Sequence, residues 1–375
     1  MPDESNHFEQ PPADTTFDIE LLKREVGQHF PFYDVKSGPD VVVFFCRIDE
    51  MMLEEKFNYL RKSLSEKGYI PMLRYEHGEH VIYVIKKPKI KKKPVWINLV
   101  LLIATIFTTT LAGSLQWVGI RNANWIEMLS PAYLFDGFIF FSAPLLLILG
   151  VHEMGHYYAS KKHNIDASLP YFIPLPPPFI LGTFGALIST REPIPNRKSL
   201  LDIGVAGPIC GFLVAIPICF LGFFLMQQNP NPVIDPSGGG YIVYPLIIQA
   251  IESFFTVPQN AFTHPTLFAG WVGIFLTAVN LLPVGQLDGG HVARAFLKEK
   301  HKYASWAVII LLLGLGISFP ESGWLMFAFI VLFLIGTQHQ PPLNEIDPLD
   351  TRRKLIGILV VIIFIVSFAP IPFSG

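Results

Sequence analysis

The chain of 375 residues is too apolar for an ordinary soluble protein: 51% of its residues are hydrophobic, and 15% are charged against the ~25% typical of soluble domains. Its formal net charge of −2 hides clusters of lysine and arginine in short segments between apolar runs, a pattern that indicates membrane orientation and argues against nucleic-acid binding. The three cysteines lack the spacing of a metal site. We therefore expect an integral membrane protein.

The N-terminal part is predicted to comprise a disordered tail, residues 1–16, and a small α/β domain, residues 17–87. The tail is polar and acidic and has no features of a secretory signal peptide. No group of residues in the domain suggests a chemical activity. Its expected elements are a helix at Phe17–Phe30, a strand at Asp40–Cys46, a helix at Glu50–Lys67 and a hairpin formed by Met72–Tyr75 and His80–Ile85.

Residues 95–372 are predicted to form a polytopic α-helical membrane domain with about six to seven transmembrane helices. Its apolar runs lie near the ~20 residues that a bilayer core requires, or are short enough to be irregular. The lysine-rich segment Lys86–Lys93 before the first run predicts a cytosolic N-terminal domain, and seven crossings would place the C-terminus outside. The predicted spans are Val95–Ile120, Leu134–Ser160, Leu200–Met226, Thr266–Leu282, Tyr303–Phe319, Trp324–Gly336 and Leu355–Pro370.

Three segments between these spans do not have the pattern of a transmembrane helix. Pro170–Thr190 is proline-rich in its first half, which excludes a helix there and predicts a membrane-embedded β-hairpin or a re-entrant loop. Asn229–Gly240, with three prolines and three consecutive glycines, is predicted to be a flexible outer loop. Tyr241–Val257 fits equally a helix lying on the membrane surface and an ordinary buried or crossing segment.

The strongest chemical signal is the pattern His-Glu-x-x-His formed by His152, Glu153 and His156, directly after an almost purely apolar stretch. Two histidines four residues apart lie on one face of a helix, where both ring nitrogens can bind one zinc ion. The carboxylate between them can then serve as general base. The pattern predicts a zinc site inside the membrane.

A zinc held by two histidines needs at least one more protein ligand. The best candidate is Asp288, a carboxylate in an apolar region followed by Gly289 and Gly290, although an aspartate there also suits a helix N-cap. His291 has a weaker claim, as a neighbour of the site rather than a ligand.

These two motifs together resemble the site-2 protease family of intramembrane zinc metalloproteases (peptidase family M50). The resemblance rests on His152-Glu153-Met154-Gly155-His156, on Asn280-x-x-Pro283-x-x-x-x-Asp288-Gly289, and on Gly182-Thr-Phe-Gly-Ala186 between them, and it covers roughly Leu134 to Lys300. It implies that one Zn²⁺ per chain is bound by His152, His156 and Asp288.

The resemblance also implies roles for residues that bind no metal. Glu153 would be the general base, and Asn280 would donate to the oxyanion or the substrate backbone, with an interhelical hydrogen bond as its structural alternative. Gly182, Phe184, Gly185 and Ala186 would bind the unwound substrate as an added strand. The spacing of Gly204, Gly207 and Gly211 indicates close helix packing rather than catalysis.

The expected function is hydrolysis of peptide bonds within or next to transmembrane segments of other proteins. A metal-binding membrane transporter and a catalytically silent membrane adaptor are the alternatives. The expected partners are transmembrane-protein substrates and the lipid bilayer, without nucleic acid and without a defined oligomeric state. The plasma membrane of a prokaryote is the expected location, with the N-terminus and active site toward the cytosol.

Overall fold

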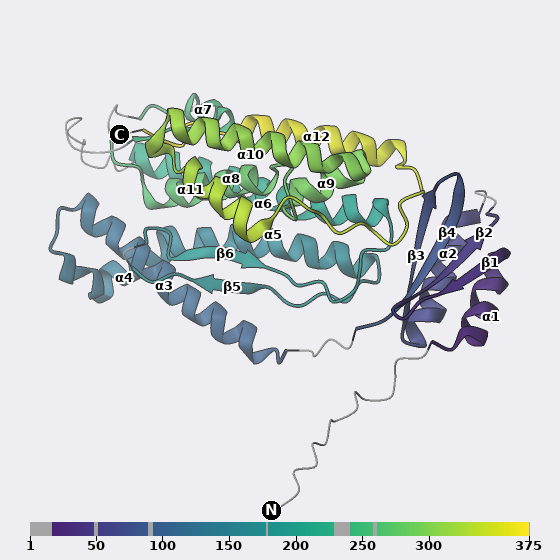
Figure 1. Cartoon of the computed structure of the whole chain (residues 1–375). Coiled ribbons are helices and arrows are strands. Elements are labelled where there is room, and N and C mark those ends of the chain that lie inside the picture. The colour runs from purple at the N-terminus through teal and green to yellow at the C-terminus, as the bar shows by residue number, and fades with distance from the viewer. Residues whose placement is uncertain are drawn as a thin grey trace, which may run out of the picture. The chain divides into compact units, whose positions relative to one another are not determined.

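The computed structural model describes residues 17–48, 52–88, 93–177, 179–228, 241–257 and 261–374. The chain divides into two compact units, one of residues 1–89 with 343–347 and one of residues 90–342 with 348–375. The helices and strands, labelled as in Figure 1, are α1 (Ile19–His29), β1 (Phe32–Ser37), β2 (Val41–Cys46), α2 (Leu53–Glu66), β3 (Tyr69–Glu76), β4 (Glu79–Lys86), α3 (Trp96–Ile120), α4 (Pro131–Gly137), α5 (Ala143–Lys162), β5 (Tyr171–Pro174), β6 (Thr183–Leu187), α6 (Arg197–Gln228), β7 (Tyr241–Ile242), α7 (Leu246–Glu252), α8 (Pro265–Asn280), α9 (Asp288–Leu297), α10 (His301–Ser318), α11 (Trp324–Ile330), α12 (Thr351–Ser367) and β8 (Phe373–Ser374).

The N-terminal unit is a four-stranded antiparallel sheet in the order β1-β2-β4-β3, accompanied by α1 and α2. The predicted hairpin is present, and its turn residues His77 and Gly78 both have positive φ, as a tight turn between twisted strands requires. Strand β1, which was not anticipated, forms one edge of the sheet and is mostly exposed. A leucine from far downstream, Leu343, joins the buried core of this unit.

The membrane unit contains four helical segments that are long and apolar enough to cross a bilayer, which agrees with the predicted class. They are Trp96–Ile120, Pro131–Lys162, Arg197–Gln228 and Asp288–Ser318. The other predicted spans correspond to α8, α11 and α12, of 16, 7 and 17 residues. A helix of 16 residues is ~24 Å long, which is shorter than a ~30 Å hydrocarbon core. The predicted number of spans is therefore not reproduced among the described residues.

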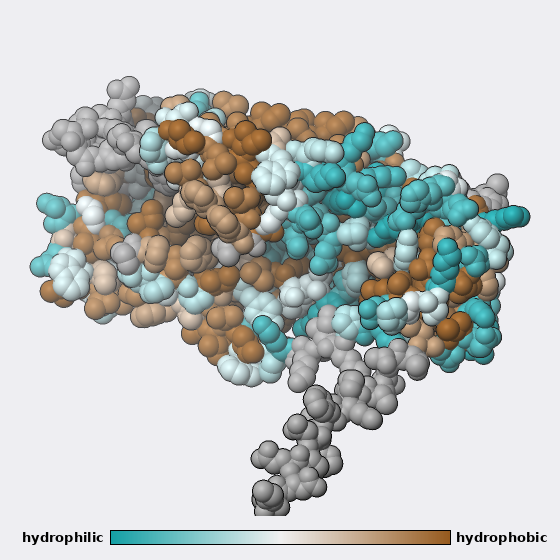
Figure 2. Space-filling model, in the orientation of Figure 1, coloured by the Kyte–Doolittle hydropathy of each residue, from teal (hydrophilic) through white to brown (hydrophobic). Residues whose placement is uncertain are grey.

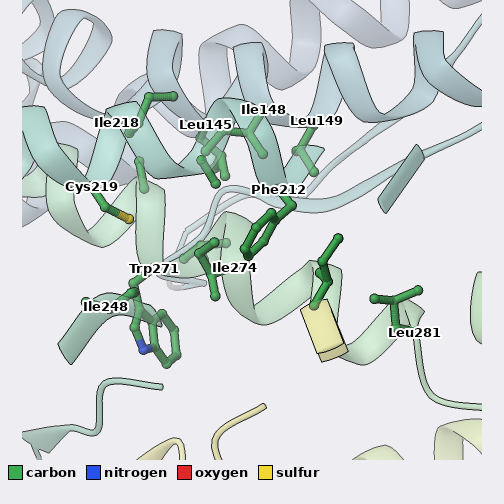
Figure 3. Close-up of a cluster of buried hydrophobic side chains, with 14 of the residues drawn as sticks. Leu145, Ile148, Leu149, Phe212, Ile218, Cys219, Ile248, Trp271, Ile274 and Leu281 are labelled. Carbon is green, nitrogen blue, oxygen red and sulfur yellow. The ribbon is translucent and has the colours of Figure 1, made fainter. Parts of the chain in front are cut away.

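Helix α6 occupies the centre of the membrane unit and packs against α5, α8 and α9. Figure 3 shows Leu145 and Ile148 of α5 facing Phe212 of α6 and Ile274 of α8 across this core. The outer surface is also apolar, because large hydrophobic side chains on α10, α11 and α12 are exposed (Figure 2). An apolar core inside an apolar surface is the arrangement expected for a helix bundle in lipid.

The proline-rich segment between α5 and α6 forms a β-hairpin. β5 pairs antiparallel with β6, and the register shifts by one residue between Phe172 and Pro174. This shift falls opposite Gly185, whose φ of +99° is suited to a bulge. Gly182 packs against α3, where its carbonyl accepts a 2.6 Å hydrogen bond from the Thr108 hydroxyl. The segment is thus irregular backbone satisfied by a neighbouring helix, which is the condition for such backbone at membrane depth.

The crossing alternative for Tyr241–Val257 is wrong. This segment contains the two-residue strand β7 and the seven-residue helix α7, which is far too short to span a bilayer. Ile248 and Ile251 of α7 are buried in the main core. β7 pairs with the C-terminal strand β8, so the two segments lie at the same end of the unit. The predicted loop Asn229–Gly240 lies outside the described residues.

Candidate metal centre and active site

Helix α5 places the two motif histidines on one buried face. His152 and His156 are four residues apart and each is 6% exposed. Their Nε2 atoms lie 3.1 Å from each other. The rings therefore converge on one point, as the sequence spacing predicts for an α-helix.

Asp288, the first residue of α9, completes the group. Its Oδ2 lies 3.3 Å from His152 Nε2 and 3.2 Å from His156 Nε2. The two glycines that follow allow this approach, because a Cβ atom at Gly289 would lie 2.0 Å from the Leu281 carbonyl oxygen and one at Gly290 would lie 2.3 Å from the Gly285 carbonyl oxygen. The start of α9 is thus packed onto the turn that follows α8, and only glycine permits this packing.

The three side chains fit a zinc ion. In a tetrahedral site with zinc–ligand distances of about 2.0–2.2 Å, ligand atoms are about 3.3–3.6 Å apart, slightly more than the separations of 3.1–3.3 Å found here. His156 Nδ1 lies 2.8 Å from the Ile203 carbonyl oxygen, so it donates its proton there and leaves Nε2 free to bind a metal. In the described part of the chain, this is the one cluster of histidine, cysteine or carboxylate side chains arranged to hold a metal.

Two glycines of α6 make room for the histidine rings. A Cβ atom at Gly207 would lie 2.1 Å from His156 Nε2, and one at Gly211 would lie 3.1 Å from His152 Nδ1. The sequence indicated only close helix packing for these glycines, whereas the packing partners are the candidate ligands themselves. A signal was present: the glycines are four residues apart, like the histidines that they contact.

Glu153 lies beside the metal group. Its carboxylate is buried, with Oε1 4.0 Å from His152 Nε2. It lies near the backbone N–H of Ile188, the residue that follows β6. The structure therefore brings the predicted general base, the predicted ligands and the end of the hairpin to one place.

The four predicted substrate-binding residues belong to β6 or precede it directly. Gly182 is buried against α3, Phe184 is 65% exposed, and Gly185 and Ala186 lie on the strand that leads to Ile188. In the described part of the chain, no strand pairs with the second edge of β6. Among the described residues this edge forms no ladder with another strand, and the Gly185 N–H is bonded instead to the Thr183 hydroxyl at 3.0 Å.

Asn280 and His291 lie outside the metal group. Asn280 is the last residue of α8, and its carboxamide has no hydrogen-bond partner among the described residues, so the interhelical bond considered above is not formed there. His291 Nδ1 lies 3.2 Å from the Leu287 carbonyl oxygen and 3.1 Å from His339 Nε2. His339, which the sequence did not single out, therefore contacts the first turn of α9.

Comparison with known proteins agrees with this geometry. Residues 140–319, which include all the candidate ligands, match the model of peptidase family M50. A probable zinc metalloprotease, EGY1 of Oryza sativa subsp. japonica, is 32% identical over 236 residues, covering 61% of this chain and 39% of the relative. Over residues 140–319, the chain is thus similar to peptidase family M50.

Two further plant proteins are similar to this chain. EGY1 of Arabidopsis thaliana is 30% identical over 60% of this chain and 42% of the relative, and EGY2 of the same plant is 28% identical over 61% and 41%. These relatives are described as probable chloroplastic zinc metalloproteases. The chain spans about two fifths of their length. No solved structure matches it.

Proposed function

We propose that this protein is an intramembrane zinc metalloprotease that hydrolyses peptide bonds within or next to transmembrane segments of other membrane proteins. The observation that carries the proposal is the buried triangle of His152, His156 and Asp288 with Glu153 at its side, inside an apolar bundle similar to family M50. Two histidines, a third ligand and a carboxylate are the groups that metal-assisted hydrolysis requires.

The proposed roles follow from the positions of the side chains. Bound zinc would polarise the scissile carbonyl and make a coordinated water more acidic. Glu153 would take the proton from the attacking water and return it to the leaving amine, because its carboxylate lies beside the group that would hold the zinc. Asn280, with its free carboxamide at the end of α8, would donate to the oxyanion or to the substrate backbone.

The substrate is proposed to bind along β6. A transmembrane helix satisfies its carbonyl groups with its own hydrogen bonds, so its cleavage requires local unwinding and replacement partners. The unpaired edge of β6 supplies backbone donors and acceptors for an added strand. Because Ile188 contacts Glu153, a strand added here would be led toward the general base.

The protein is a membrane protein, and we propose that the site opens toward the cytosol. His156 and Asp288 each lie six residues, ~9 Å along a helix, before basic residues near the end of that helix, Lys162 and Arg294. Basic residues favour the cytosolic side. The lysine-rich segment Lys86–Lys93 supports a cytosolic N-terminal domain. A prokaryotic plasma membrane is our proposed location, although the curated relatives are chloroplastic.

The transporter and the silent adaptor are not favoured. Family M50 is a peptidase family, and the metal group lies beside an intact carboxylate. Pure zinc binding would have no use for Glu153, and an ion path would require polar groups through the depth of the bundle.

The test pairs zinc content with cleavage of a panel of single-span reporter proteins in liposomes, using the wild type and Glu153→Gln. We expect both proteins to retain one zinc per chain and the wild type alone to cut. If both cut equally, Glu153 is not the base. If neither binds zinc, the proposed centre is wrong.

A further inference from the structure

The segment between α11 and α12 belongs to both compact units. Residues 336–342 are part of the membrane unit, and residues 343–347 are part of the N-terminal unit. We name residues 336–347 the strap. A segment of this kind, which is covalently continuous but has its contacts in two units, can transmit the state of one unit to the other.

The C-terminal part of the strap is built into the N-terminal domain. Leu343 is 4% exposed and joins its hydrophobic core. The Leu343 carbonyl accepts hydrogen bonds from the Leu73 backbone N–H at 2.8 Å and from Arg74 Nη1 at 3.0 Å. Asn344, 1% exposed, pairs in parallel with Leu73 on β3, the edge strand of the sheet, and donates to Asp347 Oδ2 at 2.7 Å. This is a specific strand-like attachment.

The N-terminal part of the strap lies against the turn that carries Asp288. A Cβ atom at Gly285 would lie 2.2 Å from the Gly336 carbonyl oxygen, so these two backbones are in close contact. Gly285 in turn lies against Gly290, two residues after Asp288. The strap thus contacts the turn that leads into α9.

His339 makes a second contact with the same element. Its Nδ1 lies 2.6 Å from the Gln340 carbonyl oxygen and donates its proton there, so Nε2 is left as an acceptor. His291 Nδ1, 3.1 Å away, donates to that Nε2. His291 is in the first turn of α9, three residues after Asp288. The strap therefore contacts the turn before α9 through Gly336 and the first turn of α9 through His339.

Little slack separates the two attachments. Four residues lead from His339 to Leu343, a reach of ~14 Å at full extension. Two of them, Pro341 and Pro342, have φ fixed by their rings and favour an extended chain. The connection therefore limits how far Leu343 and His339 can separate.

We propose that His339 is a positioning residue for Asp288, and that the N-terminal domain controls the metal centre by holding Leu343 and Asn344 on the edge of β3. Release of the strap from β3 would loosen the turn at Asp288 and lower both zinc retention and peptidase activity. The inference rests on the proposed zinc protease function, to which it adds a regulatory role for the cytosolic domain.

The test measures zinc release to a chelator from the full-length protein, together with amide exchange at Leu73. We expect Leu343→Ala to speed exchange at Leu73 and to release zinc about tenfold faster, the lower end of the effect of losing a residue that orients a metal ligand. His339→Ala should also speed zinc release about tenfold, but it should leave amide exchange at Leu73 unchanged. His339→Gln, which can still accept from His291, should restore slow release, and reporter cleavage should change in kcat rather than in KM.

A slack variant separates coupling from general damage. Insertion of Gly-Ser-Gly-Ser between Gln340 and Pro341 preserves both attachments but removes the short connection, so in this background Leu343→Ala should no longer change zinc release. The inference is overturned if Leu343→Ala frees Leu73 while zinc is released at the wild-type rate, or if its effect persists in the slack background. The zinc-release assay needs no substrate. A wild type that retains zinc but cleaves no reporter would therefore contradict the proposed protease function, and zinc release would still test the coupling through the strap.

Discussion

Substitution of Gly207 by alanine should destroy the metal centre without touching any ligand. The added Cβ would lie 2.1 Å from His156 Nε2, about 1.3 Å short of the 3.4 Å at which ordinary contact begins. The ring cannot turn away freely, because its Nδ1 is bound to the Ile203 carbonyl oxygen. Metal ligands tolerate displacements of only ~0.2 Å, so we expect zinc affinity to fall at least 100-fold, beyond the effect of losing a residue that merely orients a ligand.

Two other glycines provide a graded control. At Gly211 the added Cβ would lie 3.1 Å from His152 Nδ1, a contact that a shift of a few tenths of an ångström relieves, so an intermediate loss of zinc affinity is expected. At Gly150, in the same helix as both histidines, no heavy atom lies within 4 Å of the added Cβ. Gly150→Ala should keep wild-type zinc affinity and stabilise the helix by up to ~1 kcal/mol.

The assay is zinc content per chain and chelator competition for the three alanine variants in detergent, with circular dichroism as the check that each variant is folded. We expect zinc affinity to decrease in the order Gly150→Ala, Gly211→Ala, Gly207→Ala. Wild-type zinc affinity in folded Gly207→Ala would refute the packing of α6 against His156 described above.

Two predictions concern polar networks away from the metal. Hydrogen bonds from Lys67 and Ser63 hold the pKa of the buried Glu25 carboxyl below its usual range. The ionised carboxyl therefore stabilises the folded domain fully above the unfolded pKa of ~4.3, and this stabilisation is lost as the pH falls through the lower folded pKa. Glu25→Gln should therefore reduce the unfolding free energy of the N-terminal domain by about 2 kcal/mol at pH 7, and amide exchange should show this difference shrinking in acid. Asp202 in α6 accepts two hydrogen bonds from Arg353 of α12, at 2.8 and 2.6 Å. Asp202→Asn should lower the unfolding free energy by about 1–3 kcal/mol and raise amide exchange in α12. Unchanged exchange in α12 would show that this pair does not hold α12 against α6.

The parts of the site that were predictable from sequence follow from short-range geometry. The spacing of His152 and His156 determines their common face in any α-helix, and the pattern around Asp288 names a third ligand whose position depends only on the fold of the family. The role of Gly207 could not be derived in this way, because it depends on the register of α6 against α5. That register is set by packing between segments about fifty residues apart.

Most elements of the fold were also predictable from the sequence. The features that were missed have physical causes. Strand β1 escaped notice because an exposed edge strand carries little hydrophobic alternation. Leu343 was missed as a core residue of the N-terminal domain because only Ile346 accompanies it in a segment of prolines and polar residues, about 270 positions from its partner Leu73. Two apolar residues do not establish a periodicity, and their burial depends wholly on tertiary structure.

The charges of the centre explain why its residues belong together in an apolar bundle. Asp288 and Glu153 are two carboxylates with little exposure, and in the described part of the chain no lysine or arginine forms an ion pair with either. Two uncompensated charges would be very costly in such surroundings. A divalent cation held by two neutral histidines brings the sum of the charges to zero. Glu153→Gln would leave one positive charge and all three ligands in place, which is why we expect that variant to retain zinc while it loses the base.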